Sequence, residues 1–360
     1  ELAERLISAA PAGLAKVFYS DNGSTAVEVA AKMAFQHWVH RGRPEKRRFV
    51  SLDQAYHGDT LGAVSVGGID LFHRIFAPLL FEVLHAPTPY WYRHPVAREP
   101  EACRDHCLDD LGRLLAEHGD TVAALVIEPL VQGAAGMLVQ PTGFLRGVAE
   151  LCRAHEVLLI CDEVATGFGR TGTMFACEQE HVAPDFLCLA KGITGGYLPL
   201  AATLTTDAIY DAFCGDPAAQ RTFFHGHTYT GNPLACAAAV ASFDLFAREN
   251  TLAHVAEVAS LLGDELARHV AGLDHVGEVR RRGLMVGIAL VRDRQTRESF
   301  PPERAIGAEV CQALRAHGIL LRPLGPVVVL MPPLSITSDE VRRLVNATTR
   351  VIARLRAAGP

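Results

Sequence analysis

Two apolar segments of this chain each end near a polar residue that is followed by a glycine-rich loop. The first, residues 157–161, runs into Asp162, and the second, residues 186–189, is followed closely by Lys191. In an open α/β sheet the ligand binds outside the carboxyl ends of the strands. The pattern therefore predicts an α/β fold in which a carboxylate and an amine lie together at one edge of the sheet.

An acid and an amine at such an edge suit one cofactor in particular. Pyridoxal 5'-phosphate has a ring nitrogen that is held protonated by an aspartate, and an aldehyde that bonds to a lysine amine. The two strand ends therefore predict a pyridoxal phosphate site that contains Asp162 and Lys191.

Short apolar segments alternate with helical patterns through the first part of the chain. The expected strands are residues 16–20, 48–52, 123–127, 157–161, 186–189 and 201–204. Helices are expected at residues 25–40, 107–118 and 144–155, and residues 87–104, which are rich in proline, are expected to form a long surface loop. This alternation is typical of a mostly parallel sheet that is covered on both faces.

The pattern changes after residue 250. An amphipathic helix is expected at 252–273, two antiparallel strands within 276–290, a helix at 305–317, a strand pair within 320–331 and a last helix at 338–357. This order is typical of a smaller α+β domain. The sequence therefore predicts a large cofactor-binding domain over residues 1–250 and a small C-terminal domain over residues 251–360.

Composition removes several classes of function. The chain has 34 Lys and Arg against 40 Asp and Glu, with no basic stripe, so no nucleic-acid partner is expected. No apolar segment approaches the length of a membrane span, and the first residues do not have the pattern of a secretion signal. We therefore expect a cytoplasmic protein without a membrane partner.

The nine cysteines are an odd number and are scattered through the expected strands and helices. This usage predicts free thiols in a reducing compartment. Cys103, His106 and Cys107 are close in sequence, but a second ligand pair at zinc-site spacing is missing, so no metal is expected.

Three other segments carry candidate site residues, each with a plainer alternative. Gly23 and Ser24 begin a helix, where free amides bind phosphate, although Ser is also an ordinary helix-capping residue. Tyr56 follows a strand and has a ring suited to stacking on a flat cofactor, although an exposed Tyr-His pair in a loop is more common. Glu128 also follows a strand, and either supports the site or is a structural hydrogen-bond acceptor.

Taken together, these segments resemble the class III pyridoxal-phosphate aminotransferases. The resemblance covers almost the whole chain and rests on residues 162–172, residues 190–196 and residues 225–234. It implies a fold type I pyridoxal-phosphate transferase, with a mostly parallel seven-stranded sheet in the large domain and a smaller α+β C-terminal domain. The family also has an N-terminal arm before its first Gly-Ser motif, whereas 22 residues precede Gly23 in this sequence.

The resemblance implies a role in cofactor binding for several residues. Lys191 would bond to the cofactor aldehyde and later move the proton, while Asp162 would hold the pyridine nitrogen protonated. Val164 would pack on one face of the ring and Tyr56 near the other, with Glu128 in support.

Phosphate and substrate contacts are implied in the same way. Gly23 and Ser24 would bind the cofactor phosphate within one subunit. His227 and Thr228 would reach the phosphate of a neighbouring subunit, which implies a homodimer with a shared phosphate site. Gly226, Arg322, Tyr56 and Lys191 would contact the substrate, and Arg322 would pair with its distal carboxylate. The role of Arg170 stays open.

The implied activity is transfer of an amino group from a small amino donor to a keto acid. Residues 131–137, 231–237 and 322–333 look most like the members of the class that convert 8-amino-7-oxononanoate to 7,8-diaminononanoate for biotin. The donor would be S-adenosylmethionine or L-lysine. The alternatives are another ω-aminotransferase, which uses a diamine or β-alanine with pyruvate, and a non-catalytic binding protein on the same fold. A nicotinamide-dependent dehydrogenase is disfavoured because no Gly-x-Gly-x-x-Gly follows the first strand.

Overall fold

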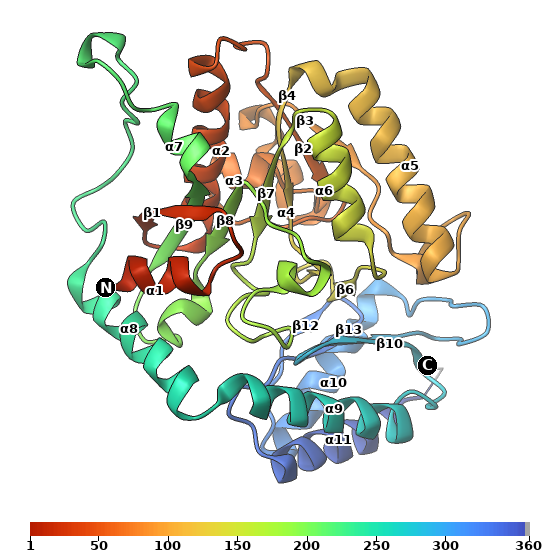
Figure 1. Cartoon of the computed structure of the whole chain (residues 1–360). Coiled ribbons are helices and arrows are strands. Elements are labelled where there is room, and N and C mark those ends of the chain that lie inside the picture. The colour runs from red at the N-terminus through yellow and green to blue at the C-terminus, as the bar shows by residue number, and fades with distance from the viewer. Residues whose placement is uncertain (357–360) are drawn as a thin grey trace. The chain divides into compact units, whose positions relative to one another are not determined.

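The six expected strands of the first part of the chain lie in one seven-stranded sheet. In the computed structural model, which describes residues 1–356, the strand order is β1-β9-β8-β7-β4-β2-β3 (Figure 1). The strands are β1 (Leu14–Ser20), β2 (Arg48–Leu52), β3 (Val83–Ala86), β4 (Val122–Ile127), β7 (Leu158–Asp162), β8 (Phe186–Leu189) and β9 (Ala201–Thr206). Neighbours from β3 to β8 pair in parallel, and β9 pairs antiparallel with both β8 and β1. The prediction of a mostly parallel sheet is confirmed.

The chain divides into two compact units. The larger unit comprises Glu1–Gln132, Gln140–Phe168 and Thr173–Arg248, and the smaller unit comprises Gly133–Val139, Gly169–Gly172 and Glu249–Pro360. Two short segments from the first part of the chain therefore belong to the smaller unit, which the expected division at residue 250 did not include.

Helices of the larger unit cover its sheet. They are α1 (Leu2–Ala9), α2 (Gly23–His40), α3 (Leu61–Ser65), α4 (Asp70–His73), α5 (Pro100–His118), α6 (Phe144–Ala154), α7 (Asp207–Asp211) and α8 (Pro233–Arg248). The short 3-10 helices are η1 (Arg74–Leu79), η2 (Trp91–Arg93), η3 (Gly119–Thr121), η4 (Ala176–Glu180), η5 (Lys191–Thr194) and η6 (Pro217–Ala219), and β5 (Val131–Gln132) is a short strand.

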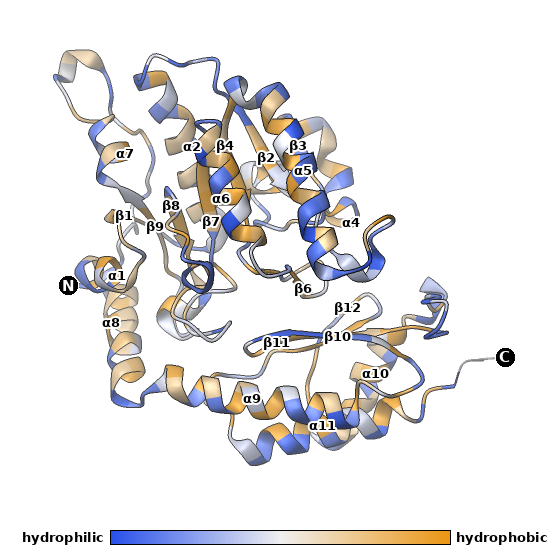
Figure 2. Ribbon diagram, turned by 45° about the vertical axis from the view of Figure 1, so that its right-hand side comes forward, coloured by the Kyte–Doolittle hydropathy of each residue, from blue (hydrophilic) through white to orange (hydrophobic). Residues whose placement is uncertain are grey.

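Close packing of α2 on the sheet follows from its small residues. Ala26, Ala30 and Ala34 are fully buried in one core cluster with residues of β4, β7 and β8. Because these side chains are short, the helix backbone comes close enough for the Thr203 hydroxyl to donate to the carbonyl of Ala26 at 2.8 Å. Every residue of β4 is buried, as expected for a strand covered on both faces. In Figure 2 the central strands are largely hydrophobic, whereas α5 and α6 alternate between hydrophobic and hydrophilic residues.

Two local expectations were wrong. Residues 87–104 do not form one long loop, because α5 begins at Pro100 and η2 lies within the segment. Proline fits the first turn of a helix, where its missing N–H would have no helical acceptor. The edge strand β3 was also missed, since it has only four residues, of which one is buried.

The smaller unit is an antiparallel sheet packed against three helices. Its sheet order is β10-β11-β13-β12, with β10 (Val276–Arg282), β11 (Met285–Leu290), β12 (Pro323–Leu324) and β13 (Val327–Leu330). The helices are α9 (Thr251–His269), α10 (Ile306–Leu314) and α11 (Ser338–Ile352), and the unit also contains β6 (Leu138–Val139), η7 (Pro302–Arg304) and η8 (Arg315–His317). Apolar faces of the three helices and the sheet form one core. The last helix ends at Ile352, earlier than expected, and residue 357 lies outside the described residues.

Among the described residues, no helix combines the length and the apolar character needed to span a bilayer.

Candidate active site

Three polar residues lie at the carboxyl ends of adjacent parallel strands. Asp162 is the last residue of β7, Glu128 follows β4 directly, and Lys191 comes two residues after β8. These strands are neighbours in the order β8-β7-β4, with Asp162 opposite Cys188 and Cys161 opposite Ile127. The structure therefore places the three residues at the same edge of the sheet.

Asp162 is buried and held by two hydrogen bonds. One carboxylate oxygen accepts from Nδ1 of His57 at 2.8 Å, and the other accepts from the backbone N–H of Val164 at 3.1 Å. Only 4% of Asp162 is exposed. Each carboxylate oxygen has two lone pairs, so Asp162 keeps capacity for a further donor such as a protonated ring nitrogen.

His57 lies beside Asp162, although no role for it was predicted from the sequence. The Tyr-His pair was expected in an exposed loop, but only 3% of His57 is exposed. Because its Nδ1 donates to Asp162, the neutral ring leaves Nε2 as an acceptor, and within the described residues this buried nitrogen has no partner. A signal was present in the sequence, because His57 follows a strand of the same parallel sheet as Asp162.

Two glycines bring the loops of this site into close contact. A side chain at Gly23 would place its Cβ 2.6 Å from Cγ1 of Val164, and one at Gly58 would place it 2.1 Å from Oγ of Ser24. Gly58 also has a φ of +125°, which L-residues with a side chain rarely adopt. The start of α2, the loop after β2 and the loop after β7 are therefore fitted to one another by residues without side chains.

The start of α2 has the features of an anion site. Asn22 and Thr25 form a reciprocal capping box, which separates the ordinary cap from the Gly-Ser pair. The Ser24 hydroxyl instead accepts from the backbone N–H of Asp59 at 3.1 Å. Within the described residues, the amides of Gly23 and Ser24 donate to no other group. Free amides at the positive end of an 18-residue helix are suited to a phosphate.

Tyr56 and Glu128 are linked directly. The backbone N–H of Tyr56 donates to Oε2 of Glu128 at 3.1 Å, and the Tyr56 hydroxyl donates to Asp59 at 2.9 Å. The Tyr56 ring is half-buried and meets Phe72 edge-on. Glu128 thus fixes the start of the loop that carries Tyr56 and His57, which fits both a structural and a supporting role.

Lys191 differs from the other lysines of the chain, which are Lys16, Lys32 and Lys46. Lys16 pairs with Asp207 at 2.8 Å, and Lys32 contacts His225 and the carbonyl of Phe224. Lys46 is buried and donates to three backbone carbonyls.

Within residues 1–356, the Lys191 amine has no hydrogen bond or ion pair, and its side chain is exposed. Its φ of +45° is left-handed, a strained conformation that costs about 1–3 kcal/mol and that is concentrated at functional sites. Lys191 is therefore the lysine whose amine is free to react.

Glu163, next to Asp162, has a different environment. It is fully buried and accepts from the Thr166 hydroxyl and from the amides of Ala176 and Cys177, at 2.8–2.9 Å. Burial raises the pKa of Glu163 to about 7, although these hydrogen bonds favour the charged form. Glu163 therefore holds the loop after β7 in place from the protein interior.

Arg170, whose role the sequence left open, belongs to the smaller unit. Its guanidinium donates to the carbonyl of Pro332 at 2.5 Å, and its own carbonyl accepts from the N–H of Leu284 at 3.0 Å. Burial lowers the pKa of Arg170. This arginine ties the segment Gly169–Gly172 to the rest of the smaller unit.

The remaining predicted residues lie on exposed segments. Gly226, His227 and Thr228 are exposed, and Nε2 of His227 lies 2.9 Å from the carboxylate of Asp21, just before α2. Arg322 is an exposed residue of the smaller unit, directly before β12, and has no ion-pair partner within the described residues. The structure therefore brings together Asp162, Lys191, Val164, Gly23, Ser24, Tyr56 and Glu128, and does not by itself join Thr228 or Arg322 to them.

This fold and site define a class of protein. A model of the family Aminotransferase class-III matches residues 1–352. The chain belongs to the class III aminotransferases, which are pyridoxal-phosphate-dependent transaminases.

Individual relatives cover nearly the whole chain. An adenosylmethionine-8-amino-7-oxononanoate aminotransferase of Geobacter sulfurreducens is 57% identical over 98% of this chain and 78% of its own length. The protein of the same name from Nitratidesulfovibrio vulgaris is also 57% identical, over 98% of this chain and 65% of its own length.

Solved structures agree with this fold. The crystal structure of the protein of that name from Methanocaldococcus jannaschii matches with a TM-score of 0.91 at 46% identity, over 98% of this chain and 78% of its own. A pyridoxal-phosphate-bound amine transaminase from an uncultivated Pseudomonas species matches with a TM-score of 0.93 at 42% identity, over 98% of this chain and 80% of its own.

Proposed function

We propose that this chain is the aminotransferase that converts 8-amino-7-oxononanoate to 7,8-diaminononanoate in biotin biosynthesis. The observation that carries the specific reaction is the 57% identity to relatives of that name over 98% of the chain. S-adenosylmethionine is the proposed donor, because the names of these relatives include it, and L-lysine is the alternative. We place the reaction in the reducing cytoplasm, which the nine free cysteines support.

The residues at the sheet edge fit pyridoxal 5'-phosphate at three points. The free amides of Gly23 and Ser24 suit its phosphate, Asp162 has lone pairs for its ring nitrogen, and Lys191 has an unengaged amine for its aldehyde. Val164, in the loop after β7, and Tyr56, in the loop after β2, are proposed to pack on the ring. Glu128 would support them by holding the amide of Tyr56.

When bound, the cofactor supplies an electron-poor ring that accepts electrons from the substrate carbon. Asp162 keeps a proton on the ring nitrogen, since a carboxylate favours the neighbouring cation. The N–H of His57 orients that carboxylate. Lys191 would hold the cofactor aldehyde through its amine, and it would be the base that moves a proton at the substrate carbon.

The reaction itself is the test of this function. Protein loaded with pyridoxal phosphate is mixed with each donor alone, and the loss of visible cofactor absorbance is followed. The proposal expects S-adenosylmethionine to bleach the absorbance and 8-amino-7-oxononanoate to restore it with formation of the diamine. If alanine or another amine bleaches it while S-adenosylmethionine and L-lysine do not, the specific reaction is wrong. The general amine-transaminase function then takes its place, which the 42% identity to the Pseudomonas enzyme favours as the second candidate.

Arg322 is proposed to bind the distal carboxylate of the keto acid, with Gly226 as a further substrate contact. Replacing Arg322 with alanine should raise the KM for 8-amino-7-oxononanoate by about tenfold or more, because a hydrogen bond to a charged group contributes roughly 1.5–3 kcal/mol. Steady-state kinetics with the donor saturating measures this effect. Arg294→Ala, at another exposed arginine of the smaller unit, is the control and should leave KM unchanged. If kcat fell by a similar factor while KM stayed constant, carboxylate binding by Arg322 would be contradicted.

We also propose a homodimer in which His227 and Thr228 reach the phosphate in the neighbouring subunit. The exposed segment that carries them also exposes large apolar side chains, with Phe224 82%, Tyr229 69% and Leu234 72% exposed. Such an apolar surface is typical of an interface with another protein.

Hybrid dimers test the shared phosphate site. Thr228→Asp should abolish activity, because its carboxylate would repel the phosphate. Co-expression of Lys191→Ala and Thr228→Asp chains with different tags yields hybrids, in which one of the two sites has neither substitution if the site is shared. Purified hybrids should then have about half the wild-type rate. Inactive hybrids would contradict the shared site, and failure to recover any hybrid would contradict the dimer.

A further inference from the structure

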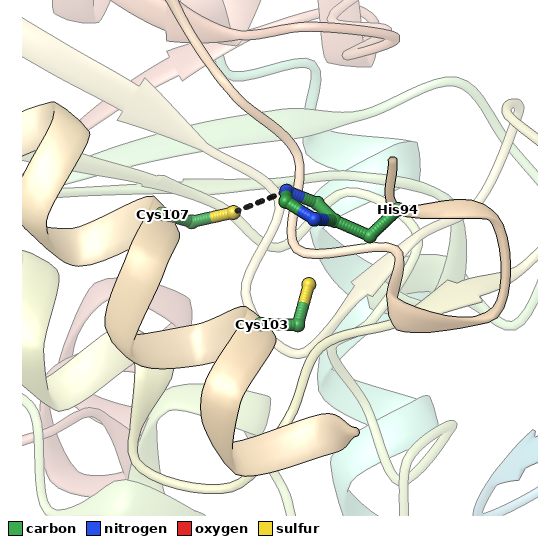
Figure 3. A group of neighbouring side chains, drawn as sticks. All are labelled: His94, Cys103 and Cys107. Atoms are coloured by element: carbon green, nitrogen blue, oxygen red, sulfur yellow. Dashed lines mark hydrogen bonds between the residues drawn. The ribbon is translucent and has the colours of Figure 1, made fainter. Parts of the chain in front are cut away.

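One group of side chains away from the sheet edge has the composition of a metal site. Cys103 and Cys107 are four residues apart on α5, so they lie on the same face of that helix. His94 comes from the segment just after η2 and points toward them (Figure 3). Their ligand atoms all lie within 4.8 Å of one another, and Sγ of Cys107 is 3.9 Å from Nε2 of His94.

We propose that His94, Cys103 and Cys107 bind a thiophilic divalent cation, with zinc the best match. Zinc binds thiolate sulfur at about 2.3 Å and imidazole nitrogen at about 2.0–2.1 Å, which places two such ligands roughly 3.5 Å apart. The observed spacing therefore needs only a small contraction. Two thiolates and one imidazole are a soft donor set that selects zinc over magnesium or calcium. Water would take the fourth position.

Burial makes this group distinct from an exposed cysteine pair. Cys103, Cys107 and His94 are 0%, 1% and 8% exposed. Both thiols lie close to the imidazole ring (Figure 3), and Asp110 is on the same helix one turn further on. On binding, each thiol loses its proton to solvent and gives a sulfur lone pair, and the imidazole gives the lone pair of Nε2.

His94 must change its tautomer to bind. Its Nδ1 accepts from the backbone N–H of Ala97 at 2.9 Å, so the neutral ring carries its proton on Nε2 and directs it to Cys107. With a metal at Nε2 the proton moves to Nδ1 and the Ala97 amide loses its acceptor. This amide is in an exposed stretch, with the neighbouring Val96 75% exposed, so water can replace the ring as acceptor. Metal binding should therefore speed hydrogen exchange at Ala97.

The sequence alone predicts no metal, because Cys103, His106 and Cys107 lack a further ligand pair. In the structure the imidazole grouped with the two thiols is that of His94, not His106. The His106 ring meets the His94 ring edge-on, but Nε2 of His106 is directed to Asp110 at 3.7 Å. His94 is nine residues before Cys103, with residues 95–99 and the start of α5 between them, and only the fold brings it to the thiols. A bound ion would fasten this segment to α5.

Zinc binding to the full chain, loaded with pyridoxal phosphate and stripped of metal by a chelator, is the test. Competition with a chromogenic chelator should reveal one tight site per chain. His94→Gln, Cys103→Ser and Cys107→Ser should each weaken it by roughly 100-fold, because even groups that only orient a ligand contribute 10–100-fold to affinity. Cys152→Ser, at another buried helical cysteine, and Cys214→Ser, at an exposed one, are the matched controls and should bind zinc as the wild type does.

Cobalt in place of zinc gives a second readout that does not depend on activity. Cobalt bound to the wild type should produce a sulfur-to-metal charge-transfer band, which is absent from the Cys103→Ser/Cys107→Ser double variant. Unchanged transaminase activity in each variant shows that the chain is still folded. The proposal is overturned if the wild type binds no more zinc than the double variant, or if His94→Gln binds zinc as tightly as the wild type.

Discussion

Replacing Lys191 with alanine is expected to abolish transamination while leaving the fold intact. The amine is exposed and unengaged, so its removal breaks no hydrogen bond or ion pair within residues 1–356. Alanine is also free of any new clash, although it keeps the strained φ of this position. Turnover should fall by about 10⁴-fold or more, because the variant loses both the covalent anchor and a general base that alone contributes roughly 10²–10⁴-fold. Steady-state rates and thermal unfolding measure the two effects.

The other lysines supply the control for this prediction. Lys16→Ala removes an exposed ion pair with Asp207, which contributes at most about 1 kcal/mol, and should leave turnover unchanged. Borohydride reduction of the cofactor-loaded wild type, followed by peptide mass analysis, should locate the label at Lys191. Label at Lys16, Lys32 or Lys46, or substantial turnover by Lys191→Ala, would contradict the proposal that Lys191 bonds to the cofactor.

Replacing Asp162 with asparagine should keep the cofactor bound but slow the half-reaction by orders of magnitude. A neutral amide does not stabilise a protonated ring nitrogen, so the ring accepts electrons less readily. We expect a fall of roughly 10²–10⁴-fold, comparable to the loss of a general acid or base. Stopped-flow absorbance after addition of the amino donor measures the rate directly.

The fold should tolerate this change because His57 can adapt. The asparagine oxygen can still accept from Val164, while its NH₂ group faces Nδ1 of His57. His57 can then move its proton to Nε2, which has no partner within residues 1–356, and accept at Nδ1. Asp207→Asn, at an exposed carboxylate of the same unit, is the control. Normal half-reaction rates in Asp162→Asn would mean that this carboxylate is only structural.

The sequence was sufficient to predict the sheet edge and its two central residues. Strands that are buried on both faces are nearly continuous apolar runs, and the first polar residue after each run marks a strand end. The positions of Asp162 and Lys191 near strand ends were therefore predictable from the local sequence pattern alone. No role was predicted for His57 or His94, because each lies beside residues that are distant in the sequence. These neighbours are Asp162 for His57 and two thiols of α5 for His94. Short-range pattern contains no information on which distant segments meet.

The sequence also did not predict that Gly133–Val139 and Gly169–Gly172 belong to the smaller unit. Individual contacts, which composition does not reveal, hold these two segments there. Arg280 donates to the carbonyls of Gly136 and Met137, at 2.5 and 2.9 Å, and Arg170 donates to that of Pro332. Gly283 allows the tight approach of the second segment, since a Cβ there would lie 2.4 Å from the backbone of Thr171.

This composite construction has a consequence for any attempt to exchange parts between related transaminases. A chimera joined once, near residue 249, would receive a foreign C-terminal part while keeping the host's two short segments. The guanidinium that holds Gly136 and the carbonyl that accepts from Arg170 would then come from a different parent than their partners. A transplant that preserves the smaller unit must carry three pieces of chain, and so five junctions, one of which falls seven residues after Asp162. Any property carried by the C-terminal part is thus inherited together with a stretch of the loop that follows Asp162.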